Sequence, residues 1–254
     1  MHSQGMVNSR LGIPAILLLF SLSSCSLVKE NRDSCPCSLV VEVSGLLNKT
    51  ATLLVTSLRD TGYVERICVA RDTVMGLFVP RGGVSISAWS GAEAQDAIKI
   101  PFGKESPPIY LYHGVVDTRG DTAYAGVTLH KQFCTLYLEV EGPPGWGPPL
   151  GAAVRGSACG MTLSGAILQG PFQCVASGSV RLPRQQPESQ LMLDILMEDK
   201  TVRTFSLGAY LQKAGYNWTA RDLSDITVHM DLSVSAVTFT SPGLTEPVVL
   251  TVDI

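Results

Sequence analysis

Cysteine is the residue type whose position in this sequence points most clearly to chemistry. Cys25 follows Leu22-Ser23-Ser24, which is the leucine–small–small–cysteine spacing of a bacterial lipobox. There the thiol receives a diacylglycerol thioether and the leader is cut in front of it. Arg10 precedes an apolar run at 11–22, shorter than the roughly 20 residues of a membrane-spanning helix. We therefore predict a signal peptide at 1–24 and lipid attachment at Cys25; the simpler alternative is an ordinary signal peptide with a cysteine nearby.

Six further cysteines leave several arrangements open. They are Cys35, Cys37, Cys68, Cys134, Cys159 and Cys174. An even number of thiols in an oxidising compartment is compatible with disulfides, and six thiols admit fifteen pairings. Cys159 and Cys174 flank a predicted hairpin, so this pair is the disulfide we prefer. The alternative for all six is a set of buried free thiols that pack as small hydrophobic side chains. Zinc is not favoured, because one residue separates Cys35 from Cys37 where zinc motifs usually have two to four.

Two threonines stand in a context for covalent modification. Asp72-Thr73-Val74 and Asp121-Thr122-Ala123 fit an aspartate–hydroxyl–small-apolar sequon used for O-glycosylation in some outer-membrane bacteria. Both lie near predicted turns, where a transferase could reach them, although Asp-Thr is also ordinary turn chemistry. Thr73 and Thr122 are therefore candidate O-glycosylation sites.

Residues that would support catalysis are scattered. Of the four histidines, His2 lies in the predicted leader, and His113, His130 and His229 are not at ligand spacing. The chain has no HExxH, no Gly-x-Ser-x-Gly and no phosphate-binding glycine loop. We predict no enzyme, no catalytic residues, no metal and no cofactor. A net charge of −3 argues against a nucleic-acid partner, which requires a basic surface.

The elements that must position these residues are short strands. Val, Ile, Leu and Thr alternate with polar residues between turns rich in Gly, Asp and Pro, as in antiparallel sandwiches. Strands are expected near 38–43, 51–57, 63–70, 74–79, 84–89, 109–114, 134–141, 152–155, 160–168, 172–182, 190–197, 226–235 and 246–254. Phe205 to Tyr216 has apolar residues at helical spacing, with Lys213 and Gly215 as a C-terminal stop.

Length and composition suit two packed domains. Without residues 1–24 the chain has 230 of its 254 residues, and 45% of the whole sequence is hydrophobic against 16% charged. We predict a lipidated tether at 25–37, an N-terminal sandwich at 38–122 and a C-terminal sandwich at 123–254. The turn-rich stretch 117–122 is the expected junction.

Several stretches occur in an order that carries a family resemblance. They are Cys25 to Pro36, Val79-Pro-Arg-Gly to Trp89-Ser-Gly91, Leu111-Tyr-His-Gly114, Val127 to Phe133, Leu207-Gly-x-Tyr-Leu, Asn217-Trp218, and Asp222 to Ile226. Taken together, and over the whole mature chain, they resemble the FimB-like anchor lipoproteins of Bacteroides-type fimbriae.

The resemblance implies an all-β fold of two tandem antiparallel β-sandwich domains of the transthyretin-like type, with one short helix in the second. It also implies a surface-exposed, lipid-anchored outer-membrane protein at the base of a fimbrium. Such an anchor would limit fimbrial length and contact pilin subunits by strand exchange. The chain ends within a predicted strand at Ile254, whereas polymerising relatives carry a C-terminal extension, so we expect a terminal subunit.

A second hypothesis comes from a different class of function. A surface lipoprotein of this size could bind a glycan or another extracellular ligand, with Trp89, Trp146 and Trp218 as stacking candidates. Trp89 closes a predicted strand and Trp218 follows the predicted helix, so both are expected in the core instead.

Overall fold

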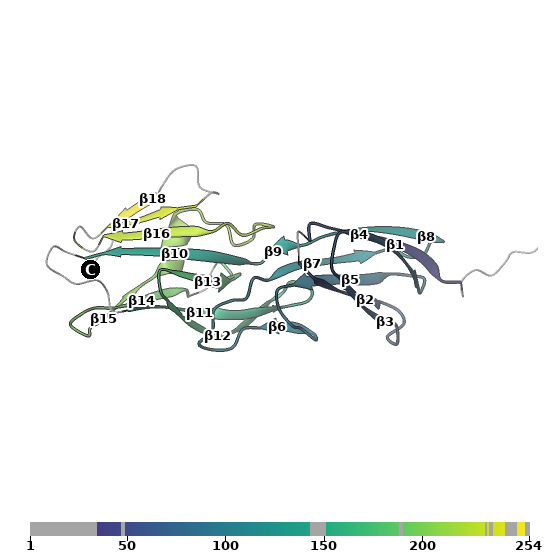
Figure 1. Cartoon of the computed structure of the whole chain (residues 1–254), viewed down its shortest axis with the longest axis horizontal. Coiled ribbons are helices and arrows are strands. Elements are labelled where there is room, and N and C mark those ends of the chain that lie inside the picture. The colour runs from purple at the N-terminus through teal and green to yellow at the C-terminus, as the bar shows by residue number, and fades with distance from the viewer. Residues whose placement is uncertain are drawn as a thin grey trace, which may run out of the picture. The chain divides into compact units, whose positions relative to one another are not determined.

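Nearly all regular structure in a computed structural model of the chain is β-strand (Figure 1). The structure describes residues 35–46, 49–142, 151–187, 190–231, 233, 236–241 and 248–251. The predicted all-β fold is confirmed. The predicted leader, Cys25 and Trp146 lie outside the described residues.

The first half of the chain forms two sheets. Its main strands are β1 (Cys37–Ser44), β2 (Ala51–Ser57), β3 (Val64–Val69), β4 (Thr73–Val79), β5 (Val84–Ser90), β7 (Tyr110–Val116) and β8 (Thr122–Thr128). One sheet has the order β4-β1-β8, and the other contains β3-β2-β5-β7. The central strand β1 is antiparallel to β4 and parallel to β8.

The second half repeats this arrangement. Its main strands are β10 (Phe133–Glu141), β11 (Gly151–Thr162), β12 (Ile167–Ala176), β13 (Ser179–Pro183), β14 (Met192–Leu196), β15 (Val202–Phe205) and β16 (Ile226–Asp231). One sheet contains β13-β10-β16 and the other contains β12-β11-β14-β15. The strand β10 is antiparallel to β13 and parallel to β16.

The same seven-strand topology therefore occurs twice, with β1, β4 and β8 equivalent to β10, β13 and β16. The repeats differ at one sheet edge. In the second repeat, β17 (Ala236–Thr240) pairs antiparallel with β16, and β18 (Val248–Thr251) pairs with β17. No strand among the described residues occupies the equivalent place beside β8.

The junction between the repeats lies later than the expected boundary at 122/123. The strand β8 pairs along the length of β1, and Ala123, Ala125 and Val127 belong to the first core. The turn-rich stretch 117–122 instead connects the two sheets of the first repeat, because it joins β7 to β8. Residues 129–132 are the short link to β10.

Two short strands tie the repeats together. The strand β6 (Ala97–Lys99) leaves the first half and pairs with the end of β11, while β9 (His130–Lys131) pairs with β7. Trp89, Ile98 and Leu111 accordingly lie in the core cluster of the second repeat. The core of the second repeat thus draws on residues from both halves of the sequence.

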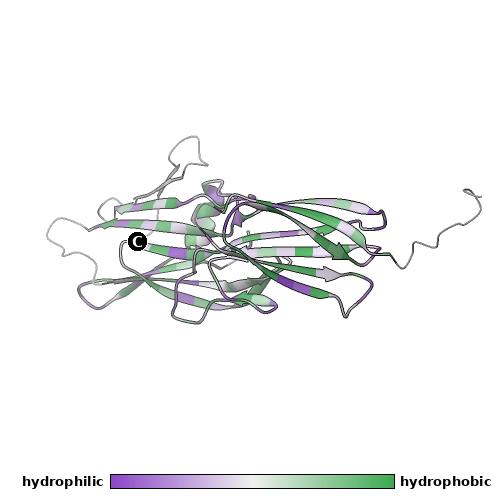
Figure 2. Cartoon of the chain, turned by 45° about the vertical axis from the view of Figure 1, so that its right-hand side comes forward, coloured by the Kyte–Doolittle hydropathy of each residue, from purple (hydrophilic) through white to green (hydrophobic). Residues whose placement is uncertain are grey.

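Hydrophobic and hydrophilic residues alternate along many of the strands (Figure 2). In β16, the side chains of Ile226, Val228 and Met230 are buried, as their period-two spacing predicts. Leu39 and Val41 of β1 are also fully buried. Burial of each such side chain contributes about 1.5–3 kcal/mol to the stability of the folded state. The strand register that places these side chains in the two cores is therefore strongly favoured.

The described helix, α2 (Leu207–Lys213), is shorter than the predicted range 205–216. Leu207 and Leu211 are buried one turn apart, which explains the apolar spacing. The helix is followed by Gly215, whose φ of +76° is readily adopted only by glycine. Phe205 lies outside the helix because it pairs with Leu193 as the last residue of β15.

Candidate subunit-binding surface

The outer face of the β4-β1-β8 sheet exposes apolar side chains. Tyr124 on β8 is 76% exposed and Phe78 on β4 is 75% exposed. Val74 on β4 is also exposed, and Val40 of β1 lies between Gly76 and Tyr124 in the register. Alternation sends the other side chains of these strands to the core, so this face displays an apolar patch that the first core does not use.

The backbone of β8 is paired on one side only among the described strands. The Ser38 N–H donates to the Asp121 carbonyl at 2.8 Å. In a parallel ladder, this bond directs the backbone groups of odd-numbered β8 residues toward β1. The even-numbered residues, from Thr122 to Thr128, therefore direct their N–H and C=O groups to the open edge.

The opposite edge of the same sheet, β4, is partly covered. In the antiparallel register, Val74, Gly76 and Phe78 direct their backbone groups away from β1. The Tyr63 hydroxyl, which donates to Glu65 at 2.7 Å, lies 3.3 Å from the Phe78 carbonyl oxygen. A strand arriving at β4 would have to displace this side chain.

Four of the other edge strands carry residues that disfavour strand addition, whereas the edge strand β18, Val-Val-Leu-Thr, does not. The residues are Glu65 and Arg66 in β3, Pro171 in β12, Arg181 and Pro183 in β13, and Arg203 in β15. Charges and prolines on an edge hinder pairing with another chain. The sequence of β8, Thr-Ala-Tyr-Ala-Gly-Val-Thr, contains neither.

The candidate glycosylation sites Thr73 and Thr122 begin the two edge strands of this sheet. Thr73 pairs with Val43 and is partly exposed, whereas Thr122 pairs with Ser38 and is exposed. Asp72 is engaged in structure, because its carboxylate accepts the N–H groups of Gly45 at 3.1 Å and Leu46 at 2.8 Å. Modification of either threonine stays a prediction.

The structure does not bring Cys159 and Cys174 together. Both are free thiols in a hairpin formed by β11 and β12, whose turn at 163–166 lies inside the strand expected at 160–168. Cys174 lies opposite Val154, while the Cys159 Sγ lies 3.7 Å from the Leu168 carbonyl oxygen. The preferred disulfide is therefore not formed, because five residues along β11 separate the two positions by far more than the roughly 7 Å that a disulfide can span between Cα atoms.

Tryptophan offers no stacking platform in the described part of the chain. Trp89 is 2% exposed and Trp218 is 5% exposed, which agrees with their expected place in the core. Beside Trp89 lies an open hollow of about 610 Å³, lined by Arg66, Glu93 and Lys99 among others. The Arg66 guanidinium carbon lies 5.2 Å from the Trp89 ring centroid and the group donates to the carbonyls at 94 and 95. Trp89 also lines this hollow, but with only 2% of its surface exposed it offers no open ring face for stacking.

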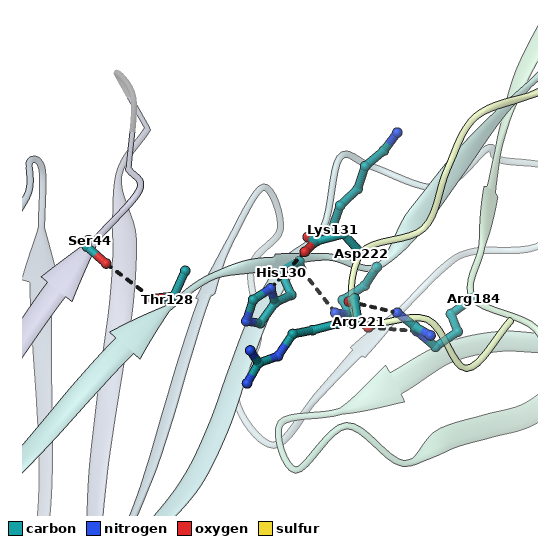
Figure 3. A network of polar contacts seen from close by, with 8 residues as sticks. Ser44, Thr128, His130, Lys131, Arg184, Arg221 and Asp222 are labelled. Atoms are coloured by element: carbon teal, nitrogen blue, oxygen red, sulfur yellow. Dashed lines mark hydrogen bonds and ion pairs between the residues drawn. The ribbon is translucent and has the colours of Figure 1, made fainter. Parts of the chain in front are cut away.

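A polar network joins the link between the repeats to the segment before β16 (Figure 3). The His130 Nδ1 lies 2.9 Å from Asp222 Oδ2, and the Lys131 N–H donates to Asp222 Oδ1 at 2.6 Å. The Lys131 Nζ donates to Asp225 at 2.6 Å, and the Thr135 N–H donates to the same carboxylate oxygen at 2.6 Å. The Asp222 to Ile226 stretch therefore has a structural role at the junction.

Burial and hydrogen-bond donors have opposite effects on the pKa values of the acidic groups in this network. Partial burial acts to raise the pKa of Asp222 and of Asp225, but the donors around each carboxylate outweigh it and hold both pKa values below the ordinary one. Arg184, which no sequence motif marks, donates to the Trp218 carbonyl and to Gln132 Oε1 at 2.7 Å. Burial lowers the pKa of Arg184. No spacing signal identifies this arginine, because its partners are carbonyls and an amide from distant segments.

No group of three metal-binding side chains occurs among the residues that the structure describes. No helix within that part of the chain is long and apolar enough to cross a membrane.

The sequence matches no protein-family model, and no curated protein matches it. Solved structures do share its fold. One is a proposed polysaccharide-binding protein (DUF1812) from Bacteroides thetaiotaomicron, 12% identical, with a TM-score of 0.62 over 85% of this chain and 98% of the other. A proposed adhesin from the same species is 12% identical, with a TM-score of 0.61 over 86% and 99%.

A third solved structure is the fimbrial anchor protein Mfa2 from Porphyromonas gingivalis. It is 10% identical, with a TM-score of 0.54 over 82% of this chain and 98% of that one. At these identities the comparison establishes the fold alone. The chain therefore has the all-β architecture shared by these three proteins, along nearly the full length of each.

Proposed function

We propose that this protein is a non-catalytic surface lipoprotein that anchors a fimbrium in the outer membrane and limits its growth. The observation that carries the proposal is the combination of a lipobox ending at Cys25 with a fold shared with a fimbrial anchor protein. The lipid would hold the chain in the membrane, and the sandwich domains would bind fimbrial subunits.

The physical chemistry of the predicted lipid anchor and of the β8 edge is consistent with this role. A single acyl chain binds a membrane only marginally, whereas the bacterial lipoprotein modification carries several chains and gives a lasting anchor. Among the described residues, the body of the protein offers an apolar sheet face and an open, uncharged edge at β8. Strand addition at such an edge supplies backbone hydrogen bonds for affinity and side-chain pockets for specificity.

The experiment is to capture the tagged protein from gently solubilised outer membranes and identify what remains bound. We expect polymerised fimbrial subunits with the wild-type protein. A Cys25→Ala strain, whose protein cannot be lipidated and placed in the outer membrane, should shed its fimbriae into the medium, whereas a Cys35→Ala strain, which replaces the nearby exposed cysteine, should not. A wild-type protein recovered without fimbrial subunits would overturn the anchor.

Glycan binding is a second candidate, favoured by the charged hollow beside Trp89 and by a similar fold in a proposed polysaccharide-binding protein. Arg66, Glu93 and Lys99 would bind sugar hydroxyls through hydrogen bonds. Calorimetric titration with surface polysaccharides tests it. Binding that is lost in Arg66→Ala but retained in Arg203→Ala, an arginine on the edge strand β15, would support this function in place of the anchor.

A further inference from the structure

We propose that the open edge of β8 receives an extended strand from a fimbrial subunit, antiparallel to β8, in the place that β17 takes beside β16. The proposal rests on the proposed function and assigns the receiving edge, the strand direction and the chemistry of the incoming segment.

The internal repeat identifies the edge. In both repeats the first strand lies between an antiparallel strand and a parallel last strand. The last strand of the second repeat, β16, pairs with β17 over five residue pairs, from Thr227↔Thr240 to Asp231↔Ala236. The last strand of the first repeat, β8, has the same neighbours on its other side and no strand beyond it among the described residues. The sheet of the first repeat therefore has room for one more antiparallel strand.

The backbone of β8 directs hydrogen-bonding groups toward the open edge, where no described strand pairs with them. The N–H and C=O groups of Tyr124 and Gly126 point to the open edge, as the bond from Ser38 to Asp121 requires. No charge or proline interrupts the seven residues of β8. The other edge of the sheet is less suitable, because Tyr63 covers the Phe78 carbonyl.

Side chains along β8 define the chemistry of the occupant. Ala123 and Ala125 face the core, each with 7% of its surface exposed. An incoming strand would place every second side chain beside them, and because alanine is small, larger apolar side chains fit there. On the outer face, a Cβ added at Gly126 would meet nothing within 4 Å, so an outward side chain of the occupant can lie over Gly126 and against the exposed Tyr124 ring. The occupant is therefore an uncharged, alternating apolar segment of about seven residues, the length of β8.

A matched pair of proline variants tests the edge. Gly126 on β8 and Gly76 on β4 lie on opposite sides of β1, and a Cβ added at either glycine would have no atom within 4 Å. Both N–H groups point away from β1, so proline at either position removes an edge donor and no existing sheet hydrogen bond. In solubilised outer membranes, Gly126→Pro should retain at least roughly tenfold less fimbrial subunit than the wild type, because the lost donor and the ring both oppose strand addition. Gly76→Pro should retain the wild-type amount. Melting temperatures of both purified variants show whether either has unfolded.

A crosslinking pair keeps the test valid if a proline variant does not fold. Tyr124 and Phe78 are exposed aromatic residues of nearly equal exposure on opposite edges of the same sheet. Each is replaced in turn by the photoreactive p-benzoylphenylalanine, and the crosslinked peptides are identified by mass spectrometry. We expect position 124 to capture a single uncharged, alternating segment of a fimbrial subunit, and position 78 to capture none.

The outcomes separate this inference from the proposed function. If fimbrial subunits co-purify with the wild type but crosslink at position 78, or survive Gly126→Pro in a folded protein, the anchor stands and the β8 edge is wrong. If the wild type retains no fimbrial subunit, the proposed function fails and the β8 proposal fails with it.

Discussion

The carboxylate of Asp222 accepts the backbone N–H of Lys131 at 2.6 Å, across 91 residues of sequence. This bond ties the segment before β16 to the link between the two repeats. Asp225, three residues later, accepts from the Lys131 side chain and from the Thr135 N–H. Two acidic side chains therefore hold β9 and the start of β10 against the segment that leads into β16.

Replacement of Asp225 should destabilise the protein measurably. Asp225→Ala leaves the Thr135 N–H and the Lys131 ammonium without this acceptor, and loss of a partly buried acceptor costs about 1–3 kcal/mol. Urea unfolding followed by tryptophan fluorescence checks this. The control is Asp96→Ala, which replaces an exposed aspartate. Equal unfolding midpoints for the two variants would contradict the role of Asp225.

Acid should weaken the same junction. The folded-state pKa values of Asp222 and Asp225 are lowered from 3.8, so their contribution is present in full above the unfolded value and is lost as pH falls through the folded values. Melting temperature should therefore decline steeply below about pH 4. A variant with asparagine at both positions should show a shallower decline over that range. An identical slope in both proteins would show that these carboxylates do not carry the acid sensitivity.

Exposed cysteines should react with alkylating reagents faster than buried ones. Burial raises the pKa of Cys134 and of Cys174 to about 12, so both remain protonated thiols at about pH 8. Native alkylation with iodoacetamide should label exposed Cys68 and spare these two. After denaturation without reductant, Cys159 and Cys174 should both become labelled, because they are free thiols. If Cys159 and Cys174 are labelled after denaturation only when a reductant is added, the two thiols form a disulfide after all.

Gly160 should tolerate no side chain. Its φ is +146°, and a Cβ there would lie 2.0 Å from the Ile98 carbonyl oxygen of β6. Gly160→Ala should lower stability by at least the roughly 1–3 kcal/mol of an unfavourable backbone conformation, and it should separate β6 from β11. Calorimetry measures the first effect, and hydrogen exchange at residues 97–99 measures the second. Gly126→Ala is the control, because its Cβ would meet no atom within 4 Å.

Local pattern predicts much of the fold. The strand β2 is expected at 51–57 and lies at Ala51–Ser57, because alternation there is strict and turn residues bound it on both sides. The interior face of β16 also follows correctly from its period of two. By contrast, no strand is expected over 122–126, the larger part of β8, because Gly126 and small alanines weaken its strand signal and its partner β1 lies far away in sequence.

The open edge of β8 could not be predicted from the sequence for a related reason. Whether an edge is open depends on which strands lie beside it, and this is a property of the complete sheet. The expected disulfide shows the limit in another way. A hairpin forms here, but its turn lies at 163–166, inside the strand expected at 160–168. The pairing register and two irregularities between Gly156 and Gly160 decide which residues face each other. No spacing rule contains that information.

The place of β1 at the centre of its sheet has a mechanical consequence. The chain enters β1 at Cys37, and β1 is paired over seven residues with β4 and over seven with β8. A load that arrives at β8 and leaves through the residues before Cys37 pulls β1 lengthwise past its neighbours. Both ladders are then loaded in shear, so their hydrogen bonds resist together instead of parting one at a time. If the protein anchors a filament as proposed, drag on that filament acts along the direction in which this sheet resists most strongly.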